Sequence, residues 1–221
     1  MLKVCAYITM LIDHIGLCFF PEAMWMRAIG RVSAPIFAYG IAVGYWHTMQ
    51  KGTEMRYLKR IGLFALVSQI PYVMMTQNPL QVSIGGTFFL SLLLLIAMNR
   101  APLVAGVSLW PLVAALILAA ATVLHVDGGA MAVLMVLQCF CFIVRPGYKW
   151  WGWTACVPLH IAWAFIYSPP QPIYILAALA YPIICLMRPY DRKVVLSKRV
   201  SYAIYPVHMA IFGVARLLLC T

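Results

Sequence analysis

The chain has 221 residues, of which 65% are hydrophobic and only 10% are charged. Soluble domains average about 45–50% apolar and about 25% charged residues, so this composition excludes an ordinary soluble globule. The net charge is +11, from 16 Lys and Arg against 5 Asp and Glu. Most basic residues lie in short gaps between apolar runs, which is typical of membrane topology and argues against a nucleic-acid partner.

The apolar runs predict an all-α fold, a polytopic transmembrane helical bundle of about nine spans in one domain covering residues 1–221. A spanning helix needs about 20 predominantly apolar residues, with a range of about 17–25. In chain order we expect the spans at 4–20, 30–49, 57–76, 83–98, 102–124, 128–144, 150–167, 172–187 and 201–219.

The charges in the gaps predict the orientation of these spans. With the N-terminus in the cytoplasm, the outer gaps at 78–81, 125–127 and 168–171 carry no Lys or Arg. The cytoplasmic segments then contain Lys3; Lys51, Arg56, Lys59 and Arg60; Arg100; Arg145 and Lys149; and Arg188, Arg192, Lys193, Lys198 and Arg199. This alternation follows the positive-inside rule and predicts a cytoplasmic N-terminus and an outer C-terminus.

Two basic residues, Arg27 and Arg31, lie at the outer start of the second predicted span. They are four residues apart and share a helix face. Their pattern fits a structural ion pair, for which Glu22 is one partner, and fits contact with a substrate or cofactor equally well. In the same span, Gly40 and Gly44 form a G-x-x-x-G pattern that predicts close helix packing.

Ionisable residues at membrane depth are costly and are therefore candidate functional residues. Asp13 and His14 lie past the middle of the first predicted span. In the ninth span Ser201, Tyr205 and His208 stand at i, i+4 and i+7 on one face. Both spans run outward, so Asp13–His14 and His208 reach comparable depth and converge if the two helices are neighbours.

This set of residues suits proton transfer. A neutral histidine in a dry site can take a proton from an amine or a hydroxyl, and a carboxylate can orient it and stabilise its cation. Neighbouring helical residues point about 100° apart, so Asp13 need not contact His14 and can pair with Arg31 or His208 instead. A histidine that only bonds a neighbouring helix is the alternative. We predict no metal, because no H-E-x-x-H or paired-cysteine spacing occurs.

Several stretches of the sequence resemble the TraX family, membrane proteins named for the acetylation of conjugative pilin. In the order and spacing of the family pattern, they are Leu2–Gly16, Ile29–Tyr39 followed by Gly44–Thr48, Tyr57–Arg60 running into Phe64–Tyr72, and Tyr202–Met209. The chain departs from that pattern at Gln69, where family members often carry Glu, and at Gly128, where they often carry an aromatic residue.

The resemblance implies an acyltransferase of the bacterial inner membrane. It would move an acetyl or other acyl group from acetyl-CoA or another acyl-CoA to an amine or hydroxyl acceptor, such as a pilin N-terminus, a glycan or a lipid headgroup. The expected catalytic residues are His14 as general base, His208 as second choice, and Asp13 to orient or charge-balance the base. The expected binding residues are Arg31, His47, Tyr57, Lys59, Arg60, Ser201 and Tyr205.

Within that set, Lys59 and Arg60 lie with Lys51 on the cytoplasmic side, where they can meet the phosphates of acyl-CoA. Arg31 lies on the other side and suits an acceptor-side contact or a pair with Asp13. Lipid is the surrounding partner, and the sequence does not fix the oligomeric state.

Two other functions fit the same residues. A proton-coupled transporter could use Asp13, His14 and His208 as a relay, and it would move substrate without consuming acyl-CoA. An odd number of spans weighs against it, since nine helices do not divide into equal inverted halves. A non-catalytic subunit of an envelope or secretion complex would use the same polar residues only to hold helices together.

Overall fold

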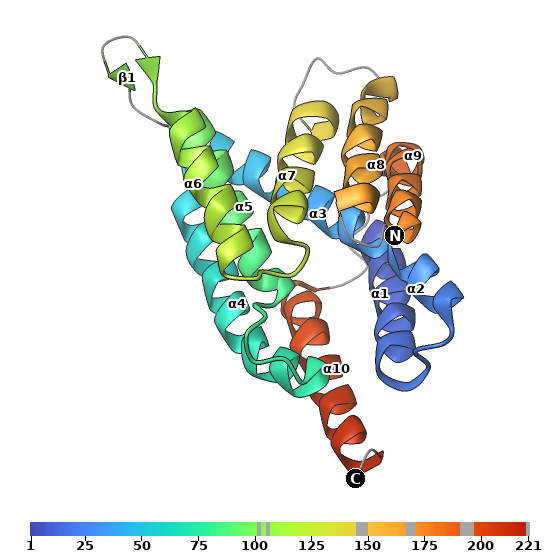
Figure 1. Ribbon diagram of the computed structural model, residues 1–221. Coiled ribbons are helices and arrows are strands. Elements are labelled where there is room, and N and C mark those ends of the chain that lie inside the picture. Colours follow the sequence, from blue (N-terminus) through green and yellow to red (C-terminus); the bar gives the residue numbers. More distant parts are fainter. Residues whose placement is uncertain (101–102, 105–106, 145–149, 167–170, 191–196, 220–221) are drawn as a thin grey trace.

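The computed structural model describes residues 1–100, 103–104, 107–144, 150–166, 171–190 and 197–219 (Figure 1). Ten α-helices lie in this part of the chain: α1 Leu2–Phe19, α2 Met24–Gly30, α3 Ser33–Gln50, α4 Glu54–Thr76, α5 Ile84–Arg100, α6 Trp110–Val123, α7 Gly129–Cys139, α8 Val157–Ile166, α9 Ala180–Met187 and α10 Lys198–Leu219. Shorter elements extend them: a π-helical turn at Phe140–Val144 and 3-10 turns at Trp150–Cys156, Pro172–Leu179 and Arg188–Tyr190.

The predicted all-α class is confirmed, and each predicted apolar run coincides with helical structure. The helix in the fifth predicted run, 102–124, begins later than predicted. It begins at Trp110, with Pro111 in the first turn, where proline is well tolerated. Before it, β1 (Leu103–Val104) and β2 (Val107–Ser108) pair as a small antiparallel hairpin. Of the predicted gap residues, Arg145, Lys149, Arg192, Lys193 and 168–170 lie outside the described part.

Helix α3 passes through the centre of the bundle and contacts α1, α4, α5, α7 and α9. Its small residues let these neighbours approach, and Ala38 and Ala42 are fully buried. A side chain at Gly44 would reach within 2.5 Å of the Tyr57 hydroxyl on α4, whereas one at Gly40 would meet nothing within 4 Å. The predicted close packing at the glycine pair therefore holds at Gly44 and not at Gly40.

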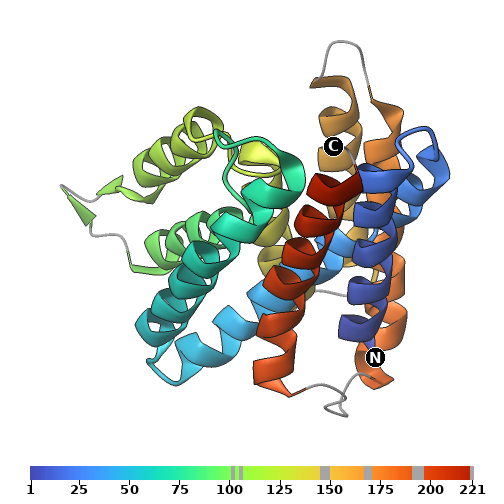
Figure 2. The same cartoon turned by 90° about the horizontal axis from the view of Figure 1, so that it is seen from below.

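Helices α1, α4 and α10 run side by side in the same direction, with α10 between the other two (Figure 2). Along α4 and α10, Phe64 contacts Tyr205, and further on Arg216 donates to the carbonyl of Met75 at 2.9 Å. This hydrogen bond ties Arg216 of α10 to α4.

The bundle presents an apolar exterior. Leu66, Ile70 and Leu186 are more than 70% exposed, as are several other large apolar side chains. In the described part of the chain, α1 and residues 199–219 of α10 are long and apolar enough to cross a membrane, and several shorter apolar helices accompany them. An apolar surface of this extent indicates a membrane protein.

Close packing of α10 on α4 generates a test. A methyl group at Gly213 would lie 2.8 Å from Cβ and 2.9 Å from the carbonyl carbon of Met74. We expect Gly213→Ala to lower the free energy of unfolding by about 1–3 kcal/mol, because a backbone contact cannot yield cheaply. The measurement is thermal unfolding in detergent, followed by circular dichroism. Gly40→Ala is the matched control and should be neutral or stabilising by up to about 1 kcal/mol. Equal effects of the two changes would contradict this packing.

Candidate functional site

Asp13 of α1 forms an ion pair with both Arg27 and Arg31. Nη2 of Arg31 lies 3.0 Å from each carboxylate oxygen, and Nη1 of Arg27 lies 3.1 Å from Oδ1. Nη1 of Arg27 also donates to the Asp13 carbonyl at 3.3 Å, and Nε of Arg31 donates to the Arg27 carbonyl at 3.3 Å. The side chain of Asp13 is only 11% exposed, so this carboxylate depends on its two partners.

The short helix α2, which the hydropathy pattern did not predict, carries Arg27 to this site. It lies directly against α1 after the turn at residues 20–23. Gly30 makes the approach possible, because any side chain there would overlap with that of Asp13. The predicted pairing of Asp13 with Arg31 is therefore present, and Asp13, rather than Glu22, is the carboxylate that pairs with both Arg27 and Arg31.

His14, the next residue of α1, points to a different helix and contacts His208 of α10. Its Nδ1 lies 2.7 Å from Nε2 of His208, and the two rings are stacked with centroids 5.0 Å apart. The first and last helices are therefore neighbours, as convergence of these residues required. We expected Asp13 to orient or charge-balance His14; the His14 ring is instead hydrogen-bonded to His208, and the Asp13 carboxylate pairs with the two arginines.

The hydrogen bonds determine the arrangement of protons in the neutral histidine pair. Nδ1 of His208 lies 2.8 Å from the carbonyl oxygen of Ile204, which can only accept, so this nitrogen carries a proton. Nε2 of His208 is then an acceptor, and Nδ1 of His14 donates to it. Nε2 of His14 is left with its lone pair and has no hydrogen-bond partner among the described residues. It is the nitrogen that can act as a base.

Aromatic rings surround the histidine pair. The ring of Tyr205 lies 5.7 Å from that of His208 and 6.5 Å from that of His14, and Phe212 packs on His208 at 5.6 Å. Both His208 and Tyr205 are only 7% exposed. The pair therefore packs against aromatic rings, with His208 buried and His14 half-buried.

A second cluster lies toward the N-terminal ends of α1 and α10. The guanidinium group of Arg60 stacks over the rings of Tyr57 and Tyr202, at 5.0 and 5.7 Å. Tyr7 donates its hydroxyl proton to the Ser201 carbonyl at 2.6 Å. The buried Ser201 hydroxyl has no hydrogen-bond partner in the described structure. Tyr57, Arg60 and Ser201, three of the predicted binding residues, are thus brought together.

The other predicted binding residues lie elsewhere. His47 is exposed near the C-terminal end of α3, and Lys59 is exposed on α4. Neither has a described contact with the histidine pair. No cluster of three or more metal-binding side chains occurs among the residues that the structure describes.

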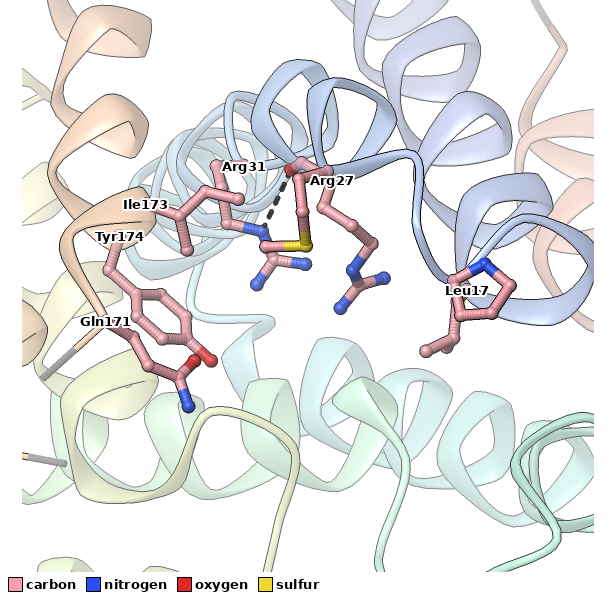
Figure 3. A pocket seen from close by; sticks show the side chains of 8 residues that line it. Leu17, Arg27, Arg31, Gln171, Ile173 and Tyr174 are labelled. Atoms are coloured by element: carbon pink, nitrogen blue, oxygen red, sulfur yellow. Dashed lines mark hydrogen bonds between the residues drawn. The ribbon is translucent and has the colours of Figure 1, made fainter. Parts of the chain in front are cut away.

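A pocket opens beside the ion pair, with an empty volume of about 480 Å³ (Figure 3). The guanidinium groups of Arg27 and Arg31 point into it, and Tyr174 and Gln171 face them from the 3-10 segment before α9. The Arg31 guanidinium also lies 5.3 Å from the centre of the Tyr174 ring. The wall of the pocket is completed by Leu17, Pro21, Met24 and Ile173.

Asp127 is a second acidic residue that sequence reasoning assigned only to an outer loop. It interacts electrostatically with Arg27 and Arg31, and burial raises the pKa of its carboxyl group although both arginines act to lower it. The left-handed turn at Gly128 (φ 75°) and Gly129 (φ 56°) directs the chain here. At Gly128 any larger side chain would meet Ala132 and Trp163, which explains the departure from an aromatic residue.

Gln69 explains the other departure from the family pattern. Its amide nitrogen donates to the carbonyl of Gln81 at 2.9 Å, and its amide oxygen accepts the backbone N–H of Ser83 at 2.9 Å. An ionised glutamate could make only the second bond, since it has no proton to donate. Through these two hydrogen bonds Gln69 holds the loop after α4 in place.

The shared ion pair generates a second test. Asp13→Asn should lower the free energy of unfolding by about 3–5 kcal/mol, because two half-buried guanidinium groups then face each other without a carboxylate. Glu22→Gln, at an exposed carboxylate in the adjoining turn, is the control and should change stability by less than about 0.5 kcal/mol. Thermal unfolding in detergent measures both. Equal stabilities of the two variants would show that the ion pair does not hold α1 to α2.

Among known proteins, one family matches nearly the whole chain. The family model described as TraX protein matches residues 1–216. An uncharacterised protein of Rickettsia prowazekii is 51% identical over 39 residues, which are 18% of this chain and 16% of that protein.

A second relative is the probable fimbrial assembly protein FimC, serogroup H1, of Dichelobacter nodosus. It is 31% identical over 72 residues, which are 31% of this chain and 28% of that protein. The matches thus span less than a third of either curated relative, and no solved structure matches. The family match is much longer than either of these and includes both histidines and the whole ion pair, so the chain belongs to the TraX family.

Proposed function

We propose that this protein is a multi-pass acyltransferase of the bacterial inner membrane that moves an acetyl or other acyl group from a cytoplasmic acyl-CoA to an amine or hydroxyl acceptor. The TraX family is implicated in pilin acetylation, which makes acyl transfer the reaction class to test. The observation that carries the proposal is the histidine pair, in which Nε2 of His14 keeps a lone pair beside the buried ring of His208.

In the proposed step, the acceptor nitrogen or oxygen attacks the thioester carbonyl carbon, and Nε2 of His14 takes the acceptor's proton. The new C–N or C–O bond forms as the C–S bond breaks. The sulfur leaves with the bonding electron pair and receives that proton from the His14 imidazolium, which gives free CoA and neutral histidine. His208 is a positioning residue, because its Nε2 accepts from Nδ1 of His14 and stabilises the cation between the two transfers.

The location of Arg60 supports a donor site at the cytoplasmic end. The stacking of Arg60 on Tyr57 and Tyr202 holds its guanidinium group at the end of α4 and α10 that the charge pattern assigns to the cytoplasm. Phe64 then lies between Tyr202 and Tyr205, with ring centroids 5.7 and 5.5 Å away. A continuous row of aromatic rings therefore connects the proposed CoA contact to the histidine pair.

A pilin N-terminus is the acceptor that the family suggests, and the short match to a probable fimbrial assembly protein supports a role in pilus biogenesis. The proposal includes nine spans with the N-terminus in the cytoplasm. It rests on the positive-inside pattern and on the common direction of α1, α4 and α10, which would all run outward.

Acyl-CoA turnover tests the role of His14. Purified wild type incubated with labelled acetyl-CoA and a pilin-derived peptide should release free CoA and transfer label to the peptide. His14→Ala should reduce the rate by about 10²–10⁴-fold, because the base is removed. His208→Gln should reduce it less, since the amide oxygen can still accept from Nδ1 of His14.

The control is His125→Asn, at an exposed histidine in a left-handed turn that asparagine also tolerates. It should keep the wild-type rate. Failure of folded wild type to bind any acyl-CoA would overturn the proposal in favour of a transporter or a non-catalytic subunit. Substrate flux across vesicles without CoA release would identify the transporter.

The donor site has its own test. Arg60→Gln should raise KM for acetyl-CoA by about tenfold with little change in kcat, because one charge-assisted contact to phosphate is lost. With acetyl-pantetheine, which lacks the nucleotide phosphates, the variant and wild type should have the same KM. Arg56→Gln, at an exposed arginine one turn earlier on α4, is the control. A KM change that persists with acetyl-pantetheine would refute a phosphate contact at Arg60.

A further inference from the structure

The pocket beside the ion pair carries an excess of positive charge. Arg27 and Arg31 are balanced by a single hydrogen-bonded carboxylate, that of Asp13, which leaves the trio with a net charge of about +1 at neutral pH. Asp127 also acts on both arginines electrostatically, but it does not line the pocket and forms no ion pair with them in the described part of the chain. The pocket (Figure 3) therefore favours an anion.

Several donors of the two guanidinium groups remain available. Hydrogen bonds to protein engage Nη1 of Arg27 and Nε and Nη2 of Arg31. Nε and Nη2 of Arg27 and Nη1 of Arg31 have no protein partner in the described part of the chain. The ion pair and the Tyr174 ring hold both groups in place, so little side-chain entropy is lost when a ligand binds.

The pocket lies at the opposite end of α1 from the proposed donor site. Leu17 lines it, whereas Tyr7 contacts the Ser201 segment near Arg60. Ten residues of α-helix separate these positions by about 15 Å. His14 lies between them in the sequence, so the pocket is placed for the second substrate and not for the phosphates of CoA.

We propose that this pocket binds an anionic oxygen group, a carboxylate or a phosphate, carried by the acyl acceptor. Arg27 and Arg31 supply the N–H donors, as guanidinium groups do for both anions. Leu17 and Met24 supply an apolar wall for the adjoining part of the acceptor. The identity of the ligand as the acceptor rests on the proposed acyl transfer, whereas anion binding itself does not.

Isothermal titration calorimetry of the purified full-length protein, in phosphate-free buffer and without acyl-CoA, tests anion binding directly. The probes are inorganic phosphate, dihexanoyl phosphatidic acid and zwitterionic dihexanoyl phosphatidylcholine. We expect binding of an anionic probe that weakens with added salt. Phosphatidic acid binding more tightly than phosphate would identify an anion carried by a lipid headgroup, whereas equal affinities would identify a site for a free anion and overturn its assignment to the acceptor.

Two variants locate the site. Arg27→Gln should weaken anion binding by about tenfold or more, since it removes the excess charge while leaving Arg31 on Asp13. Leu17→Trp should weaken it similarly by filling the pocket with the ion pair intact, which covers the case in which Arg27→Gln folds poorly. Arg56→Gln is the matched control on the exposed surface of α4 and should bind as wild type does.

Absence of anionic probe binding by folded wild type would overturn the proposal, as would unchanged affinity in both pocket variants or equal binding of phosphatidylcholine. These outcomes are independent of CoA turnover. Anion binding that depends on Arg27, in a protein without turnover, would refute the acyltransferase and leave the anion site. Turnover by a protein that binds no anion would refute the anion site and leave the acyltransferase.

Discussion

The carboxylate of Asp13 is placed in an apolar helix, where an uncompensated charge is several kcal/mol too costly to retain. Its compensation determines how the first part of the chain folds. Two guanidinium groups approach it at 3.0–3.1 Å, and both come from the segment that follows α1 directly. Gly30 permits the approach. The ion pair therefore fixes α2 against α1, and α3 begins from that fixed position.

Helix geometry directs the side chains of Asp13 and His14 toward different neighbouring helices. Adjacent side chains on a helix point about 100° apart. When Asp13 is directed toward α2, His14 is directed toward α10. There Nδ1 of His14 lies 2.7 Å from Nε2 of His208. The charged group thus sets the rotation of α1 about its axis, and this rotation aims the histidine. A change that releases the ion pair should disturb the histidine pair as well, although the two do not share a hydrogen bond.

Much of this arrangement could be predicted from the sequence, because hydropathy and helix rise act locally. The apolar runs located the helices, and equal depth along two spans pointed to the meeting of His14 with His208. Helix α2 and Asp127 could not be found in this way. Helix α2 has only seven residues and depends on its contacts with α1, and Asp127 reaches the arginines only through a turn at two glycines with positive φ. Arg27 looked like an exception to the charge rule until its partner was known.

Three levels along α1 have a mechanistic consequence for the proposed acyl transfer. Tyr7 lies at the level of Arg60 and Ser201, His14 at the level of His208, and Leu17 at the level of the arginine pocket. A base that serves two substrates from opposite sides of a membrane has to lie between their binding sites, and it has to be kept from water so that the thioester is not hydrolysed. In the proposed reaction, the aromatic rings packed on His208 would contribute to that exclusion. In the proposed acyl transfer, the donor would reach the histidine pair from the level of Arg60 and the acceptor from the level of the arginine pocket, so neither substrate would have to traverse the bundle.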